Sequence, residues 1–183
     1  MKGRAITASE NKKYALQEFF DNNNRLKCPK CGCLLDPFYR SLRIEFKSTF
    51  DFSATYEGVF IASRRFKEFI QSSEYKNLIF FPVNEKNDFF YFHVKNNVIQ
   101  IDEKKTGIKY DKKCNTCDYP ENIYGGAEIF IKQIEPLPDG FYTSDLYWRT
   151  HYIYGPIILI GLETYGKLKA QKFKGLDMVR KVF

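Results

Sequence analysis

Apolar residues recur with a helical period near the start of the chain and with a strand period soon after it. The segment ENKKYALQEFF, which follows Ser9, places its aromatic and leucine side chains mainly on one side, which predicts an amphipathic helix capped by Ser9. Leu42, Ile44 and Phe46 alternate with polar residues, as in a half-buried strand.

Three apolar segments predict that the middle of the chain is mostly sheet. NLIFFPV begins at Asn77, DFFYFHV at Asp88 and NVIQI at Asn97, and each has the length and the aromatic or β-branched content of a strand. The last two are separated by Lys95, Asn96 and Asn97, which favours a hairpin between them.

Two segments of the chain resemble each other. The segment from Gly58 to Val83 and the segment from Gly155 to Val182 each begin with glycine and an apolar strand, continue through a helical stretch and end in an apolar strand. The turns YKNL and FKGL close the two helices, and both contain a residue type that readily adopts a left-handed conformation. Either a duplication or the general similarity of strand-helix-strand units explains this pattern.

These elements predict a mixed α+β fold, a sheet with packed helices. The chain has 183 residues, of which 44% are hydrophobic, enough for a single globular domain over residues 1–183 with sub-lobes at 1–113 and 114–183. No apolar run approaches the length of a membrane span, and the first residues lack the apolar core of a secretory signal, so we expect a soluble, cytoplasmic protein without a membrane partner.

The five cysteines form two groups, CPKCGC from Cys28 and CNTCD from Cys114. In a reducing cytoplasm such pairs are metal ligands more often than disulfides. Two thiolates separated by two residues can both reach one ion, so Cys28, Cys31, Cys114 and Cys117 are the candidate ligands of a tetrahedral Zn²⁺. Two unrelated reduced pairs or a redox pair are the alternatives.

The 82 residues between Cys31 and Cys114 are many more than in an ordinary zinc ribbon. Closing this longer loop costs about 1.4 kcal/mol more, whereas structural zinc contributes on the order of 10 kcal/mol. The spacing therefore permits a site that ties the two halves of the chain together. Cys33 is not needed as a ligand, and a small buried thiol is its expected role.

The sequence offers no evident catalytic site. Four thiolates leave no coordination position for a substrate, and no G-x-S-x-G, phosphate loop or H-E-x-x-H is present. His93 and His151 lie in aromatic, strand-like surroundings that favour a packing role. We expect no enzymatic activity, although a nucleophilic Cys33 is a conceivable alternative.

The order of these features resembles the bacterial double-CXXCG motif family, from Cys28 to the C-terminal FKGLDMVRKV. The family's cysteines fall on Cys28, Cys31, Cys114 and Cys117, and its first motif glycine on Gly32, but Asp118 replaces the second glycine. The resemblance implies an immunity protein that binds and neutralises a cognate protein toxin, with zinc as scaffold.

The net charge of +7 bears on the partner. Because charge complementarity guides association, a basic immunity protein suggests an acidic or neutral toxin surface, or a local acidic patch that the net charge conceals. The alternative is a zinc-ribbon protein that binds nucleic acid through basic and aromatic side chains. Interleaved acidic residues make a solvated lysine-rich surface the simpler explanation of the charge. The oligomeric state is not indicated.

Overall fold

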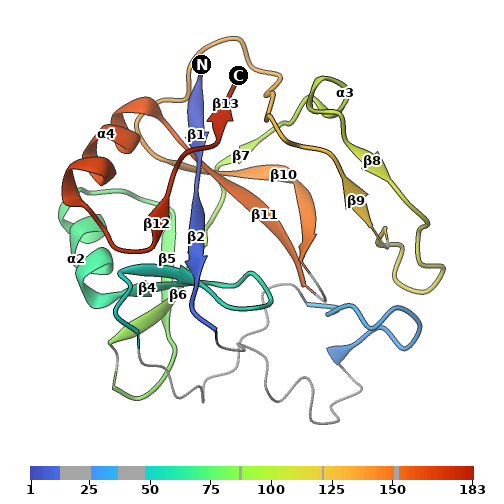
Figure 1. The fold of residues 1–183 in the computed structure, drawn as a ribbon, viewed down its shortest axis with the longest axis horizontal. Helices are drawn as coiled ribbons and strands as arrows, with labels where there is room; N and C mark the ends of the chain where they lie inside the picture. Colours follow the sequence, from blue (N-terminus) through green and yellow to red (C-terminus); the bar gives the residue numbers. More distant parts are fainter. Residues whose placement is uncertain (13–25, 37–47, 87, 121, 151–152) are drawn as a thin grey trace.

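Strands from distant parts of the chain meet in two large sheets, and the computed structural model describes residues 1–12, 26–36, 48–86, 88–120, 122–150 and 153–183 (Figure 1). Within these residues, the first sheet has five strands in the order β13 (Lys181–Val182), β1 (Gly3–Ala5), β11 (Ile153–Ile160), β10 (Phe141–Thr150) and β7 (Val98–Ile99). All neighbours in it are antiparallel except β10 and β7.

The second sheet has six described strands. Their order is β12 (Leu176–Asp177), β2 (Thr7–Glu10), β3 (Phe52–Ala54), β4 (Phe60–Ser63), β6 (Phe89–Val94) and β5 (Leu78–Pro82). A separate hairpin pairs β8 (Lys109–Tyr110) with β9 (Ile123–Tyr124). The described helices are α2 (Arg64–Ser72), α3 (Glu103–Thr106) and α4 (Leu162–Gln171). The prediction of a mixed α+β fold is confirmed, and no described helix has the length and apolar character needed to cross a membrane.

The main core lies where the two large sheets meet α2 and α4, which lie together on one side of the molecule (Figure 1). Aromatic rings dominate it, and Phe52, Phe66 and Phe92 contact one another with centroids 4.9–5.7 Å apart. The buried members are Ile6, Phe52, Ala62, Phe66, Ile70, Phe92, Val94, Phe141, Ile158, Ile160, Leu168 and Phe173. We expect the burial of these apolar side chains to be the principal source of the protein's stability.

Helix α2 begins where the sequence predicts. Ser63 Oγ accepts a hydrogen bond from the Phe66 N–H at 3.2 Å, which caps the first turn. Phe66 and Ile70 point into the core, as their spacing of four residues requires. Helices α2 and α4 end before the turns that the sequence predicts to close them, at the caps Ser73 and Lys172. Asn77 and Gly175 take the expected left-handed conformation a few residues later, with φ values of 69° and 81°.

The elements of the two similar segments occupy different places in the sheets. Strands β4 and β5, on either side of α2, belong to one sheet with β6 between them. Strands β11 and β12, on either side of α4, belong to different sheets. The duplication of a strand-helix-strand unit stays a prediction. Strands from both sides of residue 113 pair within each large sheet.

Two local predictions are wrong. The segments at 89–94 and 98–99 do not form a hairpin, because β6 pairs with β4 and β5 while β7 pairs with β10. The Asn97 side-chain amide donates to Phe141 O, and the Asn97 backbone carbonyl accepts from the Thr143 N–H. These two bonds direct the chain into the other sheet. Ser9 lies in β2 and not at a helix start. The remaining expected helix and the strand at 42–46 lie outside the described residues.

Candidate metal centre

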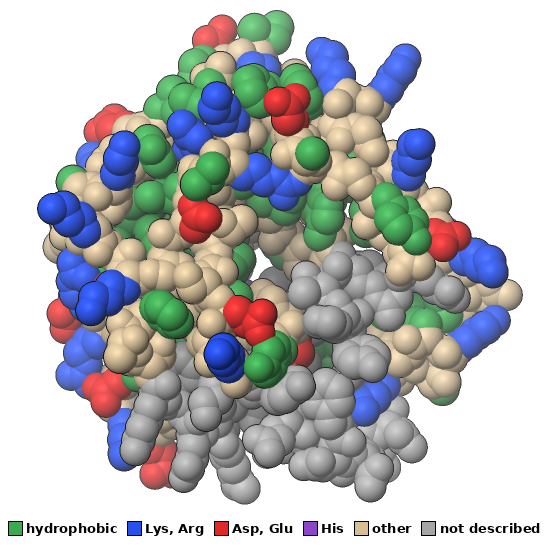
Figure 2. Space-filling view, viewed as in Figure 1, with side chains coloured by type: hydrophobic (Ala, Val, Ile, Leu, Met, Phe, Trp, Pro, Cys, Tyr) green, Lys and Arg blue, Asp and Glu red, His purple; other side chains and the backbone are tan. Residues whose placement is uncertain are grey.

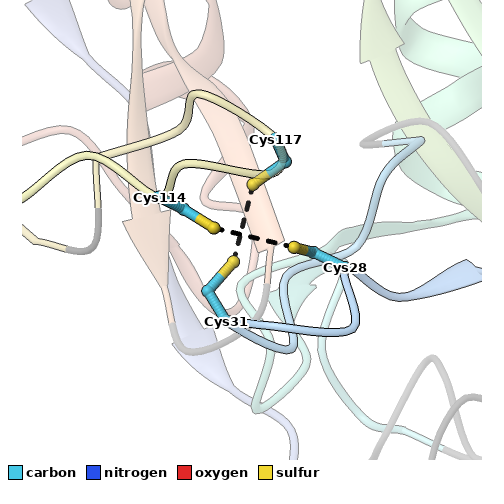
Figure 3. Close-up of side chains that lie close together, drawn as sticks. All are labelled: Cys28, Cys31, Cys114 and Cys117. Carbon is cyan, nitrogen blue, oxygen red and sulfur yellow. Dashed lines mark hydrogen bonds between the residues drawn. The ribbon is translucent and has the colours of Figure 1, made fainter.

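The first cysteine loop is a tight turn between Lys27 and Leu34, which pair as an antiparallel bridge. The Cys28 N–H donates to Cys33 O at 2.8 Å, and the Gly32 N–H donates to Cys28 O at 2.9 Å. Gly32 has a φ of 70°, a left-handed conformation that glycine adopts without steric cost. This turn brings the Cys28 and Cys31 side chains to the same side of the loop (Figure 3).

The second loop repeats this geometry. Lys113 and Pro120 form the equivalent bridge. The Cys114 N–H donates to Tyr119 O at 2.9 Å, and the Asp118 N–H donates to Cys114 O at 2.9 Å. Asp118 has a φ of 59° and takes the place that Gly32 has in the first loop. Aspartate tolerates this conformation better than most residues, so the loop keeps its shape without glycine.

The four sulfur atoms converge on one point between the loops (Figure 3). All of them lie within 4.8 Å of one another. Cys28 Sγ is 3.7 Å from Cys114 Sγ, and Cys31 Sγ is 3.5 Å from Cys117 Sγ. A tetrahedral site with zinc–sulfur bonds of about 2.3 Å has sulfur–sulfur edges of about 3.8 Å. The four thiols therefore have nearly the spacing that one tetrahedral ion requires.

The surroundings of the first cysteine in each loop favour the thiolate that binds metal. Backbone N–H groups of Cys31 and Lys30 lower the pKa of Cys28, although burial opposes them. The N–H groups of Thr116 and Cys117 lower the pKa of Cys114 to about 6. Burial raises the pKa of Cys117 to about 12. Hydrogen bonds from backbone N–H groups to sulfur thus favour the thiolate form at Cys28 and Cys114.

Each loop is anchored to a different part of the fold. Leu34, directly after the first loop, packs with Val59, Ile61, Val83 and Tyr91 on the face of the six-stranded sheet opposite the main core. The second loop lies at the end of the β8–β9 hairpin. The four cysteines therefore bring the end of that hairpin next to a loop anchored on the six-stranded sheet, and the predicted tie of these segments by an ion stays a prediction.

The remaining candidate residues are not among the four convergent side chains. Cys33 has no exposed surface, and it is absent from the group of four convergent thiols. His93 is half-buried in β6 with its ring 6.2 Å from that of Phe81. His151 lies outside the described residues. Among the residues that the structure describes, the four cysteines are the one group of His, Cys, Asp and Glu side chains arranged to hold a metal ion.

Comparison of the chain with protein-family models and with curated proteins gives no match.

Proposed function

We propose that this protein is a bacterial, cytoplasmic immunity protein that binds and neutralises a cognate protein toxin, with a structural Zn²⁺ held by its two cysteine loops. The observation that carries the proposal is the equivalence of the two loops. Because Asp118 reproduces the conformation of Gly32, the segment CNTCD has the geometry of a CXXCG motif. This equivalence supports the resemblance to the double-CXXCG family despite the missing glycine.

The donor set supports a structural metal. Cys28, Cys31, Cys114 and Cys117 would hold the ion, and four thiolates complete a tetrahedral shell without a position for substrate. A bound zinc ion supplies folding free energy at such a site. The protein's own contribution is to hold the sulfur atoms at this spacing and to keep Cys28 and Cys114 out of solvent, each with 1% of its surface exposed.

Elemental analysis of the purified chain tests the metal. We expect one zinc per chain, because four soft thiolate ligands in a tetrahedron select zinc or iron. One equivalent of iron would replace zinc in the proposal, and a folded protein that contains no metal would contradict it. Loss of the metal to a chelator should be accompanied by a large drop in the unfolding temperature.

Co-expression tests the toxin. The product of the gene upstream of this one should stop growth when expressed alone, and this protein should restore growth. The purified pair should form a one-to-one complex. An upstream product that is harmless, or growth that this protein does not restore, would contradict the proposed function even if the zinc site is correct.

A zinc-ribbon protein that binds nucleic acid is the second candidate. The β8–β9 hairpin exposes Tyr110 and Tyr124, at 44% and 54%, beside the exposed Lys109 and Lys112. Such a combination can stack on bases and contact phosphates. However, the Tyr110 hydroxyl donates to the Glu103 carboxylate at 3.0 Å, so an acidic group lies beside this ring, which weakens the case for nucleic-acid binding there.

On the face shown in Figure 2, Lys and Arg side chains do not gather in one patch. They lie along the left margin of this face, where α2 and α4 are, and at its upper right, with acidic side chains among them. Retention on heparin or single-stranded DNA at low salt, lost steeply as salt rises, would favour the second candidate. We expect no such retention.

A further inference from the structure

Strand β5 ends the six-stranded sheet, and within the described residues no strand pairs with its outer edge. The Lys95 N–H donates to Asn77 O and the Val83 N–H donates to Phe89 O, so alternate residues from 77 to 83 direct their polar groups toward β6. Leu78 and Phe80 therefore direct their N–H and C=O groups outward, while Pro82 presents only a carbonyl. Such an edge can accept one more strand.

A groove lies between this edge and α2. It has a volume of about 390 Å³ and is lined by Arg64, Lys67, Glu68, Gln71, Pro82 and Phe90. The four residues from α2 are spaced as i, i+3, i+4 and i+7, so they form one continuous stripe along the helix. The helix stripe is one wall of the groove, and the end of β5 forms part of the other.

The two faces of β5 offer different chemistry. On the face toward α2, the Lys67 Nζ lies 3.9 Å from the centroid of the Phe90 ring, and Lys67 forms no ion pair within the described residues. Arg64 pairs there with Asp88 at 3.1 Å, and Glu68 is the acidic group of the groove. On the opposite face, Phe81 is 49% exposed.

We propose that β5 and the α2 groove bind an extended, acidic segment of the partner protein as an added strand. Its alternate side chains would point to the two faces of the sheet. Acidic side chains on one face would meet Lys67, because Arg64 already pairs with Asp88, and apolar side chains on the other face would cover Phe81 and Ile79. The proposal rests on the proposed function, which requires a protein partner, and it fits the net charge of +7.

Selection from a displayed library of random seven-residue peptides on the purified full chain tests the groove. We expect peptides in which acidic and apolar residues alternate. Fluorescence anisotropy with the best of them should give a Kd that rises at least tenfold in Lys67→Glu and in Phe81→Asp. Lys104→Glu, at an exposed position of α3, which lies across the molecule from α2 (Figure 1), makes the same change in charge and should alter the Kd less than twofold.

Phe80→Pro removes an outward N–H without removing a bond to β6, so it should abolish peptide binding. Metal content and circular dichroism show whether the Phe80→Pro protein still folds. If it does not fold, the Phe81→Asp protein tests the same edge in its place. In the complex, the Leu78 and Phe80 amides should exchange with solvent more slowly. The proposal would be overturned if no peptide is selected or if the selected peptides lack the alternating pattern. It would also be overturned if their Kd does not change in Lys67→Glu.

A dimer of the chain formed through β5 would also overturn it, because a second copy would then be the occupant. Growth rescue separates this proposal from the proposed function. If Lys67→Glu and Phe81→Asp proteins still neutralise the toxin fully, the groove is not the binding site although the protein is an immunity protein. If the upstream product is not a toxin but acidic peptides bind as described, the groove stands and the immunity function fails.

Discussion

Gly32 and Asp118 occupy equivalent positions in the two cysteine loops, with φ values of 70° and 59°. The left-handed conformation costs a residue with a Cβ about 1 kcal/mol or more, and aspartate somewhat less. Asp118 also pairs with Lys113 at 3.8 Å, but both side chains are largely exposed and the pair contributes little. The second loop therefore carries a small strain that the first loop lacks.

We predict that Asp118→Gly stabilises the protein by about 0.5 kcal/mol, because glycine relieves this strain at some cost in unfolded-state entropy. The reverse change, Gly32→Asp, should destabilise it by about 1 kcal/mol. Urea unfolding of the metal-loaded proteins measures both. Effects of the same sign for the two substitutions would show that Gly32 and Asp118 are not equivalent in the two loops.

Removal of a single ligand should release the metal. Cys28→Ser and Cys114→Ser each leave three thiolates, and we expect at least a tenfold loss of metal affinity together with a destabilisation of several kcal/mol. Cys33→Ala is the matched control, since Cys33 is buried and only two residues after Cys31 but is not one of the four convergent thiols. It should keep one metal per chain. Metal loss in Cys33→Ala would reassign the ligand set.

Asp51 joins the start of α2 to the end of α4. Its Oδ2 accepts from Arg65 Nη1 at 2.7 Å and from the Lys174 N–H at 2.9 Å, and the other nitrogen of the same guanidinium donates to Gln171 O. We predict that Asp51→Asn costs about 2 kcal/mol of unfolding free energy, because charged hydrogen bonds are lost.

The exposed pair of Arg64 and Asp88 provides the control for this substitution. Both side chains are more than half exposed, and Asp88→Asn should change the unfolding free energy by less than about 0.5 kcal/mol. Similar losses in Asp51→Asn and Asp88→Asn would mean that the bonds of Asp51 to Arg65 and Lys174 contribute no more than a surface pair.

The carboxyl group of Asp139 should make the free energy of unfolding depend on pH. Burial raises the pKa of this carboxyl, but donation from Lys167, Thr164 and Tyr75 lowers it overall. A lowered pKa stabilises the folded state above the unfolded value of about 3.9, and this contribution is lost as the pH falls through the folded value. Asp139→Asn should therefore be less stable than the parent at pH 7.

The difference between Asp139→Asn and the parent should shrink as the pH falls below about 4. Measuring it as a difference removes the effect of metal loss in acid, which both proteins share. Glu163→Gln, which removes a more exposed carboxylate from the same Lys167, is the control and should show a much smaller difference. A difference that does not change with pH would assign the loss to packing and not to the charge of Asp139.

Local features of this fold could be predicted from sequence, and long-range pairing could not. The cap at Ser63 and the paired thiols within each cysteine loop follow from short spacings that fix nearby backbone geometry. The meeting of the two loops, 82 residues apart, is inferred from their shared metal-ligand chemistry and not from local geometry. The partner of the strand at 98–99 did not follow, because periodicity reports which face is buried and not which strand lies beside it. The hydrogen bonds of Asn97 to residues more than forty positions away decide that pairing.

The groove beside β5 was also not predicted. Arg64, Lys67, Glu68 and Gln71 have the composition of an ordinary solvated helix face, and the sequence does not indicate that this stripe faces a sheet edge. Similarly, Ser9 has the chemistry of a helix cap, but tertiary pairing places it in β2 beside Ser53. In both places the neighbours are distant in sequence, so local propensity has no information about them.

The pairing of Gly3 with Val182 has a consequence for how the molecule is made. The N-terminal strand β1 is synthesised first, yet both of its neighbours, β11 and β13, belong to the last thirty or so residues described. The five-stranded sheet therefore cannot close while the ribosome is still adding those residues, and such long-range pairing is slow to form. Until β11 and β13 have been synthesised, β1 lacks both of the strands with which it pairs in the folded protein.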